Sequence, residues 1–269
     1  MPSKPLSVLE SLTRYRHLVW QMSKREVIGR YRGSMLGLLW SFVHPLCMLG
    51  IYTFVFGVIF HARWGEPTKS HLDFALVLFA GLIVYTLFAE CITRAPWLVA
   101  GNPNYVKKVV FPLEILPWVA MGTALFHAAV SFAVLLVLLA GINHALPWQV
   151  LTLPLILLPL VVLTVGLSWF LATCGVYVRD TGHTITLLLM MLLFASPVFY
   201  PASALPPPLR RYMWLNPLTY AIEEVRGALF LAKTPSWTGL GIYFSLSLVV
   251  AWLGFLWFQR TRPGFADVV

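Results

Sequence analysis

The sequence has few charges for its length. Only 11% of its 269 residues are Asp, Glu, Lys or Arg, whereas 59% are hydrophobic and the mean hydropathy is +0.80. A soluble domain carries about 25% charged residues, so this composition excludes an ordinary water-soluble fold. In a bilayer the backbone must satisfy its own hydrogen bonds. The long apolar stretches therefore predict an all-α integral membrane protein.

Motifs that would supply chemistry are missing as well. The sequence has no G-x-x-x-x-G-K-[ST] phosphate loop, no HExxH and no GxSxG. No group of carboxylates falls on one predicted helix face. The three cysteines lie in apolar stretches without metal-ligand spacing, and we expect free thiols at Cys47, Cys91 and Cys174. We therefore expect no catalytic residue, metal site or cofactor in this chain, and no enzyme activity of its own.

Acidic residues are also absent from the middle of every expected span, since Glu90 falls near a span end. A carrier driven by protons or sodium usually needs such a residue, or unwound spans paired across two halves of the chain. No convincing internal repeat of that kind is present. The energy source for any transport is then expected on another polypeptide.

Uncharged stretches predict six membrane-spanning helices, because one span needs about 20 residues. They are placed near residues 36–60, 74–93, 118–140, 149–175, 183–200 and 238–258. Together they form a single transmembrane domain over residues 35–269. The basic residues predict its orientation: with the N-terminus inside, most of the 19 Lys+Arg fall in inside segments. We expect both termini in the cytoplasm.

Residues 1–34 are expected to form a cytoplasmic amphipathic helix that lies on the membrane. Basic side chains gather on one face of this segment and apolar ones on the other, which suits a leaflet of anionic lipids. An alternative is that the helix also docks a soluble partner. Gly33 and Gly37 form a GxxxG motif at the start of the first span, which permits close helix contact.

Two segments are too irregular to be spans. The first, "NPNYVKKVVFPLEILP" (102–117), is expected to face the cytoplasm, and an ordinary juxtamembrane turn would explain its lysines. The second (196–230) contains five prolines before Asn216, and then a helix over 218–230 that is too short to span. We expect a re-entrant or interface helix there. Its charges, Glu223, Glu224 and Arg226, form either a local ion pair or an outer gate that contacts substrate.

Four stretches resemble the membrane-spanning subunits of ABC exporters for lipid-linked polysaccharides such as O-antigen, capsular polysaccharide and teichoic acid. They are "REVIGRYRGSMLGLLWSFVHPL" (25–46), the segment 102–117, "SPVFYP" (196–201) and "NPLTYAIEEVRGALF" (216–230). The resemblance covers most of the chain in order and spacing. It implies a homodimer that pairs with two copies of a separate ABC ATPase, which would bind ATP and magnesium.

The resemblance further implies that segment 102–117 is a coupling helix seated in the ATPase. Pro103 and Pro112 bound a short turn with apolar side chains suited to burial in a partner and lysines suited to its acidic groups. The residues assigned to coupling are Tyr105, Lys107, Lys108, Val109, Phe111 and Pro112.

A polysaccharide path requires aromatic side chains, on which sugar rings can stack and slide. Tyr52, Phe56 and Phe60 recur every four residues on one helix face, and Phe199 and Tyr200 end the fifth span. Interface belts and helix packing explain single aromatics equally well. Arg25, Arg30 and Arg32 suit the pyrophosphate of a polyprenyl carrier at the cytoplasmic entry. Binding to the membrane surface explains them almost as well.

Three other functions stay open at this point. One is a secondary transporter or channel without an ATPase. Another is a membrane enzyme that acts on a polyprenyl lipid, for which the loops hold only scattered carboxylates. The third is an ABC exporter of a drug or a simple lipid, which would need a closed apolar pocket rather than a wide aromatic path.

Overall fold

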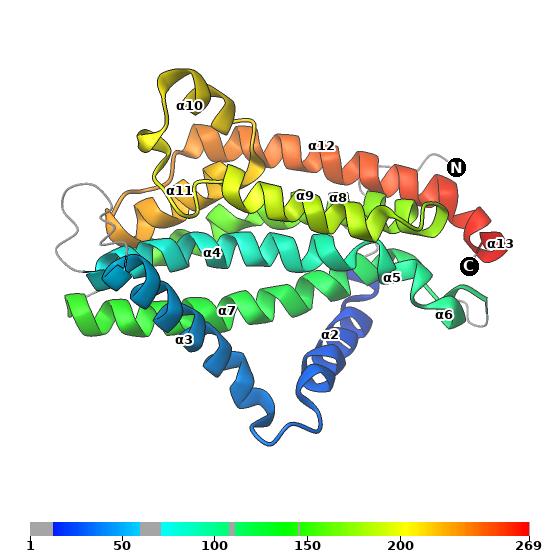
Figure 1. The fold of residues 1–269 in the computed structure, drawn as a ribbon. Helices are drawn as coiled ribbons and strands as arrows, with labels where there is room; N and C mark the ends of the chain where they lie inside the picture. Colours follow the sequence, from blue (N-terminus) through cyan, green and yellow to red (C-terminus); the bar gives the residue numbers. More distant parts are fainter. Residues whose placement is uncertain (1–12, 60–70, 108–110, 145, 269) are drawn as a thin grey trace.

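The chain is described by a computed structural model over residues 13–59, 71–107, 111–144 and 146–268. Within these ranges the regular structure is entirely helical and contains no strand. The long helices α4 (His71–Arg94), α7 (Leu116–Asn143), α8 (Leu153–Tyr177) and α12 (Trp237–Thr261) run along one another (Figure 1). The prediction of an all-α fold is confirmed for the part of the chain that the structure describes.

Five helical stretches of the described chain are long and apolar enough to cross a membrane. They are Gly37–Phe56, Phe74–Arg94, Leu113–Ile142, Trp148–Tyr177 and Trp237–Val268. Five of the six expected spans therefore have matching helices. Their ends lie a few residues from those predicted, except that the last stretch was expected to end at 258 and continues to Val268. The remaining one, expected near 183–200, corresponds to α9 (Thr181–Ala195), which has 15 residues.

The helix α9 ends early because of its local sequence. Ser196, which follows it, has extended backbone angles. Pro197 has no backbone N–H and disfavours helical angles at the residue before it. The short helix is apolar, but its length leaves it below that of an ordinary span.

The first span is interrupted rather than continuous. It consists of the short helix η1 (Gly37–Leu39), α3 (Trp40–Tyr52) with Pro45 inside it, and a widened π-helical stretch η2 (Thr53–Ile59). Gly33 precedes this span and Gly37 begins it, and both have positive φ angles, 87° and 50°. No heavy atom lies within 4 Å of a Cβ placed on either one. The GxxxG interpretation was wrong, because these glycines turn the chain between helices instead of packing two helices together.

Helix α4 lies at the centre of the molecule. Residues from Phe74 to Tyr85 are all buried, and α4 packs against α3, α7, α8, α9 and α11. The other spans leave more of their apolar side chains exposed, as helices facing lipid do. Residues on α4 are therefore placed where several helices can reach them.

Helices α8 and α12 form the closest pair in the fold. A Cβ on Gly166 would lie 2.5 Å from the Cα of Ala251, and one on Gly254 would collide with the backbone oxygen of Gly166. Small residues permit this backbone contact between two membrane helices. Three residues after Gly166, Trp169 is fully buried, and its indole N–H donates a 3.0 Å hydrogen bond to the Glu114 carbonyl.

The remaining short helices gather at opposite ends of the molecule (Figure 1). Helices α5 (Trp97–Ala100), α6 (Pro103–Lys107) and α13 (Phe265–Val268) lie at one end, and α10 (Pro207–Met213) and α11 (Pro217–Phe230) at the other. The short helix expected over 218–230 is confirmed as α11. Asn216 caps it by accepting a 2.9 Å hydrogen bond from the Leu218 N–H, and Pro217 occupies its first turn.

Helix α2 (Arg16–Tyr31) lies outside the bundle and forms a V with α3 (Figure 1). It contacts α7, where the Ser23 hydroxyl donates a 3.2 Å hydrogen bond to the Val119 carbonyl. Ser23 and Val27 are its buried residues, and most other side chains on it are exposed. This arrangement leaves a space between α2, α3 and the bundle.

Candidate functional site

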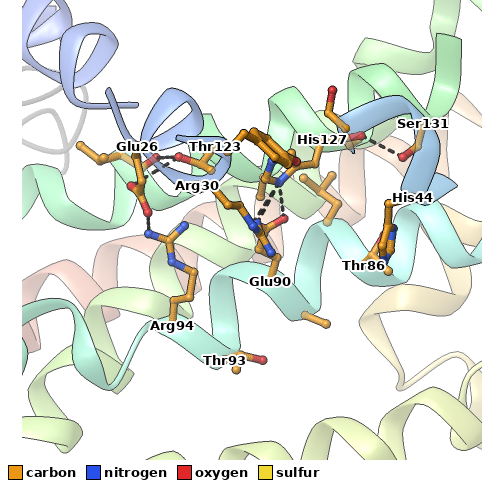
Figure 2. A pocket seen from close by; sticks show the side chains of 18 of the residues that line it. Glu26, Arg30, His44, Thr86, Glu90, Thr93, Arg94, Thr123, His127 and Ser131 are labelled. Atoms are coloured by element: carbon orange, nitrogen blue, oxygen red, sulfur yellow. Dashed lines mark hydrogen bonds and ion pairs between the residues drawn. The ribbon is translucent and has the colours of Figure 1, made fainter. Parts of the chain in front are cut away.

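A large cavity of about 1570 Å³ occupies the space between α2, α3, α4 and α7. Polar and charged side chains gather in one part of its wall, as Figure 2 shows, and the rest of the wall is mainly apolar. The polar part is lined by Arg25, Glu26, Arg30, Glu90, Arg94, Thr123, His127 and Ser131. Such a cavity suits an amphiphilic ligand, which has a polar head and an apolar tail.

Two ion pairs cross the cavity between α2 and α4. On α2, Glu26 precedes Arg30 by four residues, and on α4 Glu90 precedes Arg94 by the same spacing. Residues four apart share a helix face, so each helix presents one carboxylate and one guanidinium to the other. The Arg30 Nη1 lies 2.6 Å from the Glu90 Oε1, and Arg94 pairs with Glu26. The two pairs fasten α2 to the central helix.

Helix α7 completes this group with His127. Its Nδ1 lies 2.9 Å from the Glu90 Oε2, and its Nε2 lies 3.3 Å from the Tyr31 hydroxyl. A ring protonated at Nδ1 satisfies both contacts, since Nδ1–H then donates to Glu90 and Nε2 accepts from Tyr31. Burial raises the pKa of Tyr31, which keeps its hydroxyl protonated as the donor. The Thr123 hydroxyl lies 3.4 Å from the Glu26 Oε2.

The structure brings together two of the three arginines expected to bind pyrophosphate. Arg25 and Arg30 line the cavity, whereas Arg32 follows the end of α2 and is not part of the wall. Sequence reasoning missed Glu26, Arg94 and His127. A signal for the first two was present, because the same Glu–x–x–x–Arg spacing occurs at both Glu26 and Glu90.

The aromatic residues expected along the polysaccharide path form a contiguous group. Tyr52 lines the cavity, and its ring centroid lies 6.3 Å from that of Phe56. The Phe56 ring stacks on Phe199 at 5.8 Å, and Phe199 stacks on Phe194 at 5.6 Å. The Tyr200 hydroxyl donates a 2.9 Å hydrogen bond to the Phe194 carbonyl. Rings from α3, η2 and the end of α9 thus adjoin one another, and Phe60 lies outside the described residues.

The segment expected to couple to an ATPase (102–117) contains α6 and the short helix η3 (Leu113–Ile115), and it ends at the start of α7. Within it, the rings of Tyr105 and Phe111 stack with centroids 4.5 Å apart, and both are half-buried against the hydrophobic core. Lys107 is exposed and Pro112 is half-buried. Lys108 and Val109 lie outside the described residues. The exposed side of α6 therefore presents Asn104 and Lys107, while Tyr105 on α6 stacks on Phe111 beyond its end.

The end of the last long helix fixes this segment in place, which sequence reasoning did not anticipate. The Arg262 Nη1 donates a 2.8 Å hydrogen bond to the Glu114 Oε2, and its Nη2 donates to the Phe111 carbonyl at 3.3 Å. Phe265, at the start of the short helix α13 that follows, is fully buried. Segment 102–117 is thus attached to the C-terminal end of α12 by a charge-assisted contact.

At the opposite end, Arg226 on α11 is buried and donates to backbone carbonyls from two other places in the chain. Its Nε donates to Val77 on α4 at 3.0 Å, and its Nη2 to Val198 at 2.7 Å. Its Nη1 donates to Pro197 and lies 3.8 Å from Glu223. Arg226 therefore holds α11 against α4 and against the turn that follows α9.

Glu224, the third residue of the expected outer gate, contacts a different partner. Its carboxylate accepts hydrogen bonds of 3.4 Å from the backbone N–H of Ser236, which caps α12. Burial raises its pKa above the ordinary value for a glutamate. The three expected gate residues thus lie on one helix, and two of them, Arg226 and Glu224, join it to α4, to the turn after α9 and to the start of α12.

The described residues contain no group of three or more His, Cys, Asp and Glu side chains that could hold a metal ion. The charged groups of the cavity are arranged as ion pairs.

Comparison with known proteins adds independent information. The family model for ABC-2 type transporter membrane domains matches residues 17–230. The chain is 27% identical to the "O-antigen export system permease protein RfbA" of Myxococcus xanthus, over 98% of this chain and 100% of that protein. It is 25% identical to the "Polysialic acid transport protein KpsM" of Escherichia coli, over 88% and 90% of the two chains. The "Capsule polysaccharide export inner-membrane protein CtrC" of Neisseria meningitidis is 22% identical over 96% of each.

Proposed function

Because the chain belongs to the ABC-2 type transporter family, we propose that it is the permease subunit of an ATP-driven exporter for a lipid-linked polysaccharide. The observation that carries the proposal is the match to relatives named for O-antigen and capsular polysaccharide export, which extends over nearly the full length of both chains. The substrate would move from the cytoplasm across the inner membrane. The relatives' names also favour polysaccharide over a drug or a simple lipid.

The permease would work as a homodimer with two copies of a separate ABC ATPase, since this sequence has no phosphate loop. ATP and magnesium would bind to that partner. The exposed end of α6, including Lys107, would contact the ATPase, and Arg262 would transmit movement of this segment to α12. With both termini in the cytoplasm, α6 would lie on the side of the membrane where the partner binds.

Within the membrane, α9 would act as the short fifth of six crossings, and α11 would be a re-entrant helix on the outer side. The segment 1–34, with α2 as its described part, would lie on the cytoplasmic surface of the bilayer. The carrier pyrophosphate would enter past Arg25, Arg30 and Arg32. The sugar chain would follow the aromatic group of Tyr52, Phe56 and Phe199, whose rings adjoin one another. Glu223, Glu224 and Arg226 would control the outer exit.

The proposal is tested by purifying the tagged protein together with the polypeptides encoded beside it. We expect an ATPase to co-purify and polysaccharide export to require its nucleotide hydrolysis. Replacing Lys107 with glutamate should uncouple hydrolysis from export, because the exposed lysine would then repel acidic groups on the partner. Replacing the exposed Lys24 in the same way serves as the charge-matched control. Export that continues without any nucleotide-hydrolysing partner would refute the proposal.

A further inference from the structure

The cavity between α2 and α4 has the two-part wall that an amphiphile needs. Its charged part presents the guanidinium groups of Arg30 and Arg94 from opposite helices (Figure 2). The remaining wall is dominated by apolar side chains, including Leu18, Met22, Met48, Leu82, Ile83 and Leu87. A ligand with a charged head and a hydrocarbon tail could place both parts in matching surroundings.

Neither arginine uses all its donors in the ion pairs. A guanidinium has five N–H groups arranged for planar, bidentate contact with carboxylate or phosphate. The Arg30 side chain is 56% exposed, and its contacts with the Glu90 Oε1 at 2.6 Å and the His127 Nδ1 at 3.3 Å both use Nη1. The Arg94 side chain is 31% exposed and pairs with Glu26 through Nη2. Both groups therefore have donors left for an anion inside the cavity.

We propose that this cavity binds an amphiphile with a phosphate or pyrophosphate head, and that the head replaces Glu90 and Glu26 as the partner of Arg30 and Arg94. In the empty cavity the two carboxylates hold the arginines in the positions that the anion later uses. When the head binds, the ion pairs between α2 and α4 break. The anion then bridges Arg30 on α2 and Arg94 on α4 in place of the direct ion pairs.

The displaced carboxylates keep other partners, which makes this exchange feasible. A partly buried carboxylate that loses every donor is costly. Glu90 retains its 2.9 Å contact with His127, and Glu26 retains Thr123 at 3.4 Å. Both of these partners are on α7, so each displaced carboxylate keeps a contact with α7 when its arginine turns to the anion.

The inference deepens the proposed function, on which the choice of a polyprenyl pyrophosphate as ligand rests. A phospholipid of the membrane has the same chemistry, since it also joins a phosphate head to an apolar tail. Three probes separate the sources: farnesyl pyrophosphate, the uncharged alcohol farnesol, and a short-chain phosphatidylglycerol. Binding of each is measured on the purified full-length protein in nanodiscs of zwitterionic phosphatidylcholine.

The pair of substitutions Glu26→Gln and Glu90→Gln gives the decisive result. We expect it to tighten binding of farnesyl pyrophosphate by about tenfold or more, because the arginines no longer prefer a carboxylate. The pair Arg30→Gln and Arg94→Gln should weaken binding by at least about tenfold. Lys24→Gln removes a charge from α2 outside the cavity wall and should leave binding unchanged. The single variant Glu90→Gln repeats the test if the double variant folds poorly.

Tighter binding of phosphatidylglycerol in the Glu→Gln variants, with no effect of farnesyl pyrophosphate, would support the same site with a phospholipid as its ligand. Unchanged affinity in those variants, with only a lower melting temperature, would overturn the inference and leave the ion pairs as a structural lock. Farnesol binding as tightly as the pyrophosphate would overturn it as well. ATP-dependent export measured in parallel keeps this outcome separate from failure of the proposed function.

Discussion

Arg262 and Glu114 are 148 positions apart in the chain, and the Arg262 Nη1 donates a 2.8 Å hydrogen bond to the Glu114 Oε2. The same guanidinium donates to the Phe111 carbonyl. One side chain at the end of α12 thus holds both the carboxylate and the backbone of the turn between α6 and α7. Movement of that turn must either carry the end of α12 with it or break this contact.

Replacing Arg262 with alanine should uncouple ATP hydrolysis from export. Glu114 is 12% exposed and would lose its charged partner, so we expect a loss of stability of about 1–3 kcal/mol. Hydrolysis by the complex should continue while export per ATP falls several-fold. The measurement compares ATPase and export rates in reconstituted vesicles. Arg260→Ala removes an exposed arginine two residues earlier and provides the control; equal losses in both variants would contradict a specific role for Arg262.

Arg226 and Gly81 should show a strong energetic coupling. A Cβ on Gly81 would lie 2.5 Å from the Arg226 Nη2, so Gly81→Ala must displace the guanidinium from its carbonyl partners. We expect destabilisation by about 2–4 kcal/mol, since buried carbonyls lose their donor. The loss of stability caused by Gly81→Ala should be smaller in a protein that already carries Arg226→Met. Thermal unfolding of the four proteins gives this double-mutant cycle, and additive effects would show that the two positions are independent.

The glycine contact between α8 and α12 makes a second stability prediction. A methyl group on Gly254 would collide with the Gly166 backbone oxygen, so Gly254→Ala should force the helices apart and cost about 1–3 kcal/mol. Gly241→Ala on the same helix meets no atom within 4 Å. It should be neutral or stabilise by up to about 1 kcal/mol, because alanine favours helix. Melting temperatures in detergent measure both, and similar values for the two variants would contradict the close contact.

The sequence predicts a helix well when the pattern that marks it does not depend on packing. The helices α4, α7, α8 and α12 were located within a few residues because long uncharged stretches are visible without knowledge of packing. The interruption of the first span was not predicted, and Gly33 and Gly37 were assigned to helix contact rather than to the turn they form. Their positive φ angles depend on where the chain must change direction, which a GxxxG spacing does not specify.

The candidate site was less predictable, because its contacts join distant segments. Arg30 was expected there for its charge alone, whereas its pairing with Glu90 depends on how α2 lies over α4. Arg226 was expected to pair with a neighbouring glutamate. Most of its hydrogen bonds go instead to backbone carbonyls. Every residue has such a carbonyl, so no sequence pattern marks the ones that Arg226 contacts.

The aromatic group provides the last test, because it separates a sugar path from simple packing. Phe56 stacks on Phe199. The Tyr52 ring lies 6.3 Å from the Phe56 ring and lines the cavity. If sugar rings slide along these faces, Phe56→Leu should reduce export several-fold, since leucine keeps apolar volume but offers no flat ring. Phe56→Tyr keeps the ring and should retain most export.

Both variants need a matched packing control. The Phe258 ring is fully buried and packs edge-to-face on Phe265, away from the aromatic group. Phe258→Leu should therefore lower the melting temperature, while export per folded complex remains close to that of the unchanged protein. Export is measured as polymer delivered per assembled complex, so that lost protein does not count as lost transport. If Phe56→Leu and Phe56→Tyr export equally well, the ring of Phe56 serves packing alone and the path must run elsewhere.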